Sequence, residues 1–97
     1  MREFYQNVMA VICRHTGFNE PQLLHDRSEI VTDARHLLVH LLGEKLTNQE
    51  IVHATGLLKQ TVSRLMNGYQ LRAKQKFSLR CLETEVRKEI NKQHLTT

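Results

Sequence analysis

One stretch of 22 residues, Leu46 to Asn67 (LTNQEIVHATGLLKQTVSRLMN), constrains the fold of this chain more than any other. Thr47 is followed three residues later by Glu50, the spacing of a capping box at the start of a helix. Gly56 stands where that helix should end, because glycine readily adopts the left-handed conformation of a helix C-terminal turn. Apolar residues at helical spacing resume soon afterwards. The stretch therefore predicts two helices joined by a tight turn, over about residues 47–67.

The second of these helices has two different faces. Leu57 is predicted to be buried in the turn, and Val62, Leu65 and Met66 are predicted to face inward. The outward face collects long polar side chains: Lys59, Gln60, Ser63, Arg64 and Asn67. This pattern is typical of a helix-turn-helix whose second helix enters the DNA major groove. The alternative is a helical hairpin that only fills a core, but such a hairpin does not need this polar outward face.

The rest of the chain predicts an all-α fold. Its 97 residues suit a single domain over residues 1–97. Helix-forming residues dominate, and one proline and five aromatic residues argue against a β-sandwich or barrel. No apolar run approaches the roughly 20 residues that span a bilayer, and no signal-peptide segment is evident. We therefore expect a cytoplasmic bundle of five to six helices that does not contact membranes.

Further helices are predicted on both sides of the central motif. The first is predicted over about residues 2–15, and a short second helix is capped by Asn19 and ends near residue 24. A core helix capped by Asp26 is predicted to end near Lys45. After a Gly68-Tyr69 turn, a last helix is predicted over about residues 70–92. The core helix is expected to bury Ile30, Ala34, Leu37, Leu38, Leu41 and Leu42. The last helix is expected to turn Leu71, Phe77, Cys81, Leu82, Val86 and Ile90 toward the core or a partner chain.

The apolar stripe of the last helix leaves two interpretations open. Leu79, Leu82, Val86 and Ile90 either close the core of the monomer or form the seam of a homodimer. A dimer would place two reading helices one DNA turn apart, about 34 Å.

Side chains that could carry catalysis or bind metal are sparse. Cys13 and Cys81 lie among apolar neighbours, so we expect reduced core thiols and no disulfide. His36 and His40 have the spacing of a metal-binding pair, but no third ligand is evident, so two surface imidazoles are the simpler interpretation. Phosphate-loop, nucleophile-elbow and zinc-protease motifs are missing. The sequence predicts a binding protein, not an enzyme, with no cofactor and no metal.

Positive charge is concentrated in one part of the chain. The net charge is +4, yet residues 51–82 contain six basic residues and no acidic one, and the remaining eight basic residues face ten acidic ones. The six are Lys59, Arg64, Arg72, Lys74, Lys76 and Arg80. The excess coincides with the predicted reading helix and the segment after it, which favours a polyphosphate partner over a merely solvated face.

The run IVTDARHLLVHLLGEKLTNQEI, with the following glycine, Thr61 and Val62, resembles the C-terminal DNA-binding domain of the bacterial replication initiator DnaA. That domain belongs to the Trp-repressor-like group of helical folds. The resemblance covers roughly residues 4–68 and includes a Thr-Gly-Phe turn and a Leu-Leu pair before Arg27. It implies a bacterial, nucleoid-associated protein.

The resemblance also implies roles for individual residues. Arg27 matches an arginine that reaches into the minor groove, Arg35 one that contacts backbone phosphate, and Thr61 a threonine of the reading helix. The family has an Arg-Asp-His-Thr run where this chain has Leu57-Leu58-Lys59-Gln60. This chain is therefore expected to read a different DNA sequence, and its basic last helix has no clear counterpart in the family.

These observations together predict sequence-specific binding of double-stranded DNA by a transcriptional, replication or mobile-element regulator. Gln60 can form hydrogen bonds with adenine, and Arg64 or Lys59 can form them with guanine. Leu58 either touches a thymine methyl or packs the turn. The predicted DNA-binding residues are Arg27, Arg35, Thr47, Leu58, Lys59, Gln60, Thr61, Ser63, Arg64, Asn67, Arg72 and Lys74. About six phosphate contacts predict a thousandfold loss of affinity between 50 and 200 mM salt. The alternatives are a protein–protein interaction module that keeps the fold, and an RNA binder, which five aromatic residues support poorly.

Overall fold

The computed structural model describes residues 2–95, and side chains through residue 93. Within residues 2–95 the chain forms helices and no strand, which confirms the predicted all-α bundle. The helices are α1 (Arg2–Thr16), α2 (Glu20–His25), α3 (Glu29–Leu42), α4 (Asn48–Thr55), α5 (Lys59–Gln75) and α6 (Phe77–Leu95). Among these described helices, none has the combination of length and apolar character that crossing a membrane requires.

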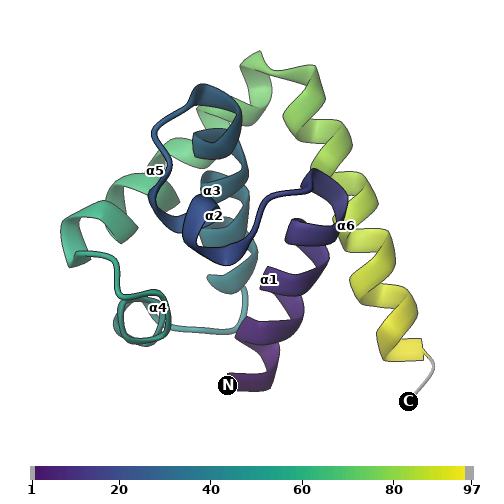
Figure 1. Cartoon of the computed structure of the whole chain (residues 1–97), viewed down its shortest axis with the longest axis horizontal. Helices are drawn as coiled ribbons and strands as arrows, with labels where there is room; N and C mark the ends of the chain where they lie inside the picture. Colours follow the sequence, from purple (N-terminus) through teal and green to yellow (C-terminus); the bar gives the residue numbers. More distant parts are fainter. Residues whose placement is uncertain (1, 96–97) are drawn as a thin grey trace.

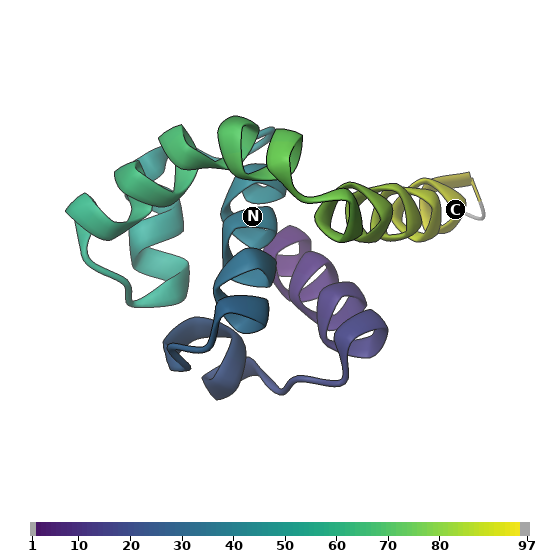
Figure 2. The same cartoon turned by 90° about the horizontal axis from the view of Figure 1, so that it is seen from above.

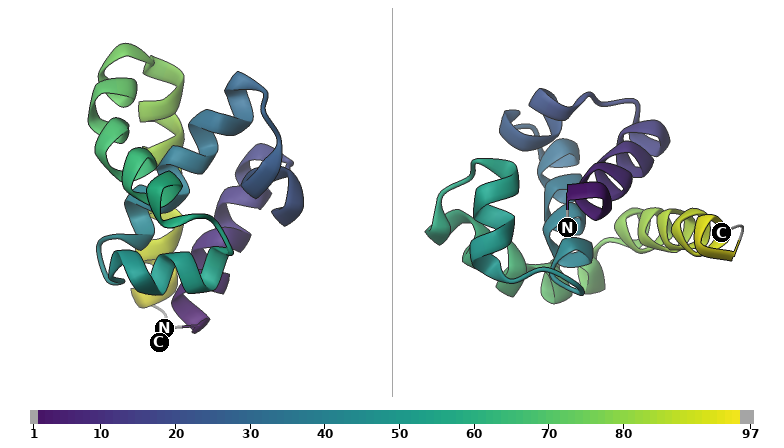
Figure 3. Two further views of the ribbon diagram at one scale, coloured as in Figure 1. Left: turned by 90° about the vertical axis from the view of Figure 1, so that its left-hand side faces the viewer. Right: turned by 90° about the horizontal axis from the view of Figure 1, so that it is seen from below.

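Helix α3 is the centre of the bundle. It packs against α1, α2, α5 and α6, and Leu37, Leu38, Val39 and Leu42 are fully buried along it. Figure 1 shows α5 running across the molecule from the end of α4 to the start of α6, with α4 seen nearly end-on. Figure 2 shows α6 at one side of the molecule, and Figure 3 shows α4 beside the first turns of α5. The α4–α5 unit is therefore held against the core by α3.

Local sequence signals fixed most helix ends as predicted. The Asn19 side chain caps α2 and the Thr47 side chain caps α4, each in a complete capping box. Gly56 ends α4 with a φ of 75°, in the left-handed region. Asp26 is not the N-cap of α3, contrary to prediction. Ser28 is the N-cap, and the Asp26 carboxylate instead accepts a hydrogen bond from the Ser28 N–H at 2.9 Å.

The predicted turn at Gly68-Tyr69 is wrong. Both residues lie inside α5, which continues to Gln75, so the last helix begins at Phe77 and not near residue 70. Tertiary contacts outweigh the low helix propensity of glycine here. The Tyr69 side chain is 1% exposed, stacks on the His40 ring at 4.1 Å between centroids, and its hydroxyl donates a hydrogen bond to Glu83.

Three residues expected at the core, or at a partner chain, are exposed. Ile30, Leu71 and Phe77 are 72%, 63% and 70% exposed, because α3, α5 and α6 bury other faces. The predicted stripe of α6 does face inward. Leu79 and Val86 are buried and Leu82 and Ile90 pack against the core, so this stripe closes the monomer. A homodimer through α6 stays a prediction, and it would need a different face of that helix.

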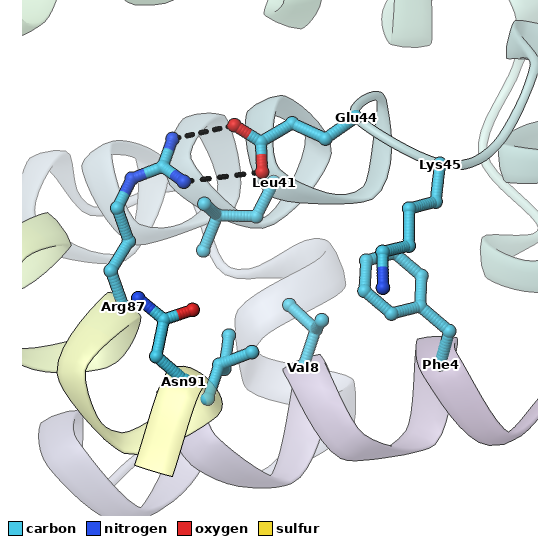
Figure 4. Close-up of a pocket in the computed structure, with 8 residues that line it drawn as sticks. Phe4, Val8, Leu41, Glu44, Lys45, Arg87 and Asn91 are labelled. Atoms are coloured by element: carbon cyan, nitrogen blue, oxygen red, sulfur yellow. Dashed lines mark hydrogen bonds and ion pairs between the residues drawn. The ribbon is translucent and has the colours of Figure 1, made fainter. Parts of the chain in front are cut away.

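A polar network fastens α6 to α3 and α5. Arg87 donates two hydrogen bonds to the Glu44 carboxylate, at 2.7 and 3.1 Å, and a third to Glu83 at 2.7 Å. Figure 4 shows the paired Arg87 and Glu44 above a small cavity of about 90 Å³. Burial alone would raise the pKa of Glu83, but hydrogen bonds from Tyr69 and Arg87 outweigh it and lower the pKa.

Candidate nucleic-acid interface

The turn between α4 and α5 leaves the first residues of α5 open to solvent. The Gly56 N–H donates to the Val52 carbonyl at 2.9 Å, and Leu57 is buried beneath the turn as predicted. Leu58 is the N-cap of α5, but its apolar side chain cannot accept a hydrogen bond from the first-turn N–H groups. Since Leu57 packs the turn and Leu58 is 68% exposed, the second predicted role of Leu58, packing the turn, is wrong.

The first half of α5 presents one polar surface, which we call the α5 face: Lys59, Gln60, Ser63, Arg64 and Asn67. Ser63 is half-buried and the other four are exposed, as the spacing predicted. No hydrogen bond or ion pair with another described side chain engages any member of the α5 face. These side chains are therefore available to a partner without breaking a contact inside the protein.

The two threonines assigned to this region have different surroundings. Thr47 is exposed, and its Oγ1 accepts a hydrogen bond from the Glu50 N–H at 3.1 Å. Its hydroxyl can still donate a hydrogen bond to an acceptor. Thr61 is half-buried and lines a groove between α3 and α5.

Much of the predicted basic cluster is neutralised inside the protein. Arg72 donates to Asp33 at 2.6 Å, and Lys76 contacts the same carboxylate at 3.1 Å. Arg80 donates to the Ala73 and Lys74 carbonyls, at 2.8 Å each, and so satisfies the C-terminal end of α5. Of the six cations counted in the sequence, Lys59, Arg64 and Lys74 are the three whose side chains form no ion pair or hydrogen bond with the described residues.

The two arginines assigned by family resemblance also have different surroundings from each other. Arg27 is exposed between α2 and α3. Arg35 donates from Nε to the Leu23 carbonyl at 2.7 Å and from Nη2 to the Asp26 carbonyl. Desolvation lowers the pKa of Arg35, although Asp26 opposes the shift. Arg35 therefore holds the α2–α3 junction in place, and only part of its guanidinium is left for a partner.

His36 is not at the surface, contrary to prediction. Its ring is 7% exposed, and Nδ1 lies 2.9 Å from the Thr32 carbonyl. It lines the same groove as Arg35, Arg64 and Thr61. The burial of His36 was not predicted from the sequence, because its spacing to His40 suggested two surface imidazoles. In the structure, α5 covers both rings. The one available signal was Gly68, a small residue inside a helix that crosses α3.

The two cysteines and the possible metal ligands are the last of the predicted features. Cys13 is half-buried and Cys81 is exposed, so the prediction that both are core residues is wrong for Cys81. Burial raises the pKa of the Cys13 thiol. In the part of the chain that the structure describes, no three His, Cys, Asp or Glu side chains are grouped as metal ligands.

Comparison with protein-family models, curated proteins and solved structures gives no significant match to this chain.

Proposed function

We propose that this chain binds double-stranded DNA and reads its sequence with the first half of α5. The observation that carries the proposal is the α5 face, on which the side chains of Lys59, Gln60 and Arg64 are exposed and have no partner among the described residues. A short turn precedes this face, and uncapped N–H groups begin it, a combination that suits a helix inserted end-first toward phosphates and bases. The resemblance to the DnaA C-terminal domain supports the same assignment of α4 and α5 as a helix-turn-helix.

The side chains divide into readers and positioners. Gln60 has the donor and acceptor pair that matches adenine, and Arg64 or Lys59 has the donors that match guanine, each worth about 1–3 kcal/mol of discrimination. Ser63 and Asn67 lie on the same face, and the exposed Leu58 would touch a thymine methyl. Thr47, Thr61 and Lys74 would contact phosphates and set the register, and Arg27 would reach into the minor groove.

Salt dependence tests the electrostatic part of the proposal. Because Arg35 and Arg72 are engaged internally, four cations with no side-chain partner among the described residues would neutralise phosphate charge at the interface, including those that read bases: Arg27, Lys59, Arg64 and Lys74. Four neutralised phosphate charges predict about a hundredfold loss of affinity between 50 and 200 mM salt, less than the thousandfold expected from sequence. Fluorescence anisotropy with a duplex selected from a random library measures this slope. An affinity that stays flat over this range contradicts the proposal.

A protein–protein interaction module is the second candidate. Four large apolar side chains are exposed, namely Ile30, Leu58, Leu71 and Phe77, and such side chains are common at protein interfaces. This candidate predicts no salt-sensitive retention on a duplex-DNA resin. Competition between duplex DNA and RNA of the same sequence distinguishes DNA binding from the RNA-binding alternative.

A further inference from the structure

A shallow groove of about 600 Å³ runs between the first half of α3 and α5. It adjoins the α5 face, since Arg64 belongs to both. From α3 it is lined by Thr32, Arg35 and His36, and from α5 by Thr61, Arg64 and Gly68. The groove thus lies beside the surface that we propose reads DNA, where a phosphate strand would flank the reading helix.

His36 presents one ring nitrogen to this groove. A carbonyl oxygen can only accept, so the Nδ1 that contacts the Thr32 carbonyl at 2.9 Å carries the proton of the neutral ring. Nε2 is then unprotonated, and it has no hydrogen-bond partner among the described residues. No buried side-chain nitrogen or oxygen in that part of the chain lacks a partner, so Nε2 is reached by solvent.

Gly68 opens the path to this nitrogen. A Cβ added at Gly68 would lie 3.5 Å from Nε2 and 3.7 Å from Cδ2 of His36. Gly68 has no positive φ, and glycine costs about 1 kcal/mol relative to alanine inside a helix. Neither backbone conformation nor helix stability explains a glycine here, but an alanine Cβ would contact the His36 ring and narrow the access to Nε2.

The charges around the ring favour an anion. On α3, Asp33 and Arg35 neighbour His36, and Glu29 lies at the end of the groove. On α5, Arg72 and Lys76 share the Asp33 carboxylate and Arg64 is free. Burial lowers the pKa of His36, with Arg72 and Arg35 adding to this shift, while the Thr32 carbonyl and Asp33 oppose it. Asp33 and Glu29 pair with Arg72 and Lys76, so Arg35 and Arg64 leave the groove with a net positive charge, and the His36 ring is neutral near pH 7.

We propose that the α3–α5 groove binds one phosphate group of the DNA backbone, and that His36 takes up a proton as the phosphate enters. The protonated Nε2 of His36 donates to a phosphate oxygen, while Arg64, at the edge of the groove, adds positive charge there and keeps its proposed contact with a base. The inference rests on the proposed function, and it adds that DNA binding is coupled to the uptake of one proton by His36. Binding is therefore tighter at lower pH, by at most about tenfold per pH unit, because a single proton is taken up.

The test measures duplex affinity at constant salt from pH 7.5 to 5.5, in the wild type and three variants. We expect the wild-type Kd to fall by about tenfold across this range. His36→Gln cannot take up the proton, and Gly68→Ala covers Nε2 with a methyl group, so both variants should show a flat profile. His53→Gln is the matched control, because His53 is exposed on α4 away from the groove, and it should keep the wild-type profile. If His36→Gln and Gly68→Ala keep the wild-type profile, the inference is overturned.

NMR titration of the His36 ring separates failure of this inference from failure of the proposed function. We expect the pKa of His36 to rise when the duplex is added. A duplex that binds without moving this pKa overturns the inference and leaves the proposed function intact. If no duplex binds, inorganic phosphate alone is titrated. A rise in the pKa then supports an oxyanion site for a free phosphate, and no rise overturns the groove as a site.

Discussion

Thr47 shows how one residue stabilises the α4–α5 unit locally. Its hydroxyl accepts from the Glu50 N–H and its own N–H donates to the Glu50 carboxylate at 2.9 Å. Thr47→Ala removes this cap and should lower the free energy of unfolding by about 1 kcal/mol. Ser28 is a matched control, because it is an N-cap whose side chain makes no capping hydrogen bond. Chemical denaturation should show a much smaller loss for Ser28→Ala, and equal losses would contradict this role for Thr47.

Two glycines in the same unit should respond oppositely to alanine. Gly56 has a φ of 75°, and no atom of the described residues lies within 4 Å of an added Cβ, so Gly56→Ala should cost about 1–2 kcal/mol through backbone conformation alone. Gly68 lies inside α5 with a right-handed conformation, and Gly68→Ala should stabilise the fold by about 0.5–1 kcal/mol. Thermal unfolding of the two variants measures both signs. A loss at Gly68 would show that the added methyl group disturbs the His36 ring.

Residue-scale features were predictable where their causes are local. The Asn19 and Thr47 caps and the Gly56 turn depend on neighbours within four residues, and each was confirmed. The pairing of Asp33 with Arg72 and Lys76 joins residues 39 and 43 positions apart, so the sequence could not show that these cations are neutralised. The number of free cations near the α5 face was overstated for this reason.

At the scale of helices, periodicity identified which side of a helix is apolar but not what covers it. Leu71 and Phe77 fit a helical stripe, yet both are exposed because α5 and α6 bury other faces. The end of α5 was misplaced because Gly68 resembles a turn signal, while the burial of Tyr69 depends on His40 and Glu83 from other helices. Helix existence therefore followed from the sequence, and the length of α5 did not.

The docking of α6 offers a test at this scale. Arg87→Met keeps helix propensity but removes the hydrogen bonds to Glu44 and Glu83, so it should lower the free energy of unfolding by about 1 kcal/mol, a modest value because these groups are partly exposed. Lys88→Met is the control, since its ion pair with Glu85 is at the surface, and it should change stability by less than about 0.5 kcal/mol. Urea denaturation that ranks the two variants the other way would contradict the role of Arg87 in holding α6.

For the whole molecule, the buried His36 ring links stability to pH. Its pKa is lowered in the folded state, so between that pKa and about 6.5 the unfolded chain binds more protons than the native one. Stability should therefore fall as the pH drops below about 6.5, and part of this fall should disappear in His36→Gln. Denaturation midpoints at pH 7.5 and 5.0 measure it in the free protein, without DNA. Equal losses in both proteins would contradict a neutral buried ring.

We propose that the α5 face reads bases while cations beside it hold phosphates. Binding of the wild type, Arg64→Ala and Lys74→Ala to a selected duplex and to its single-base-pair variants separates these two roles. We expect Arg64→Ala to lose about 1–3 kcal/mol of discrimination at one base pair, and Lys74→Ala to weaken binding to all duplexes equally. The reverse pattern, or no duplex binding by the wild type at 50 mM salt, would show that the α5 face does not read DNA in this way.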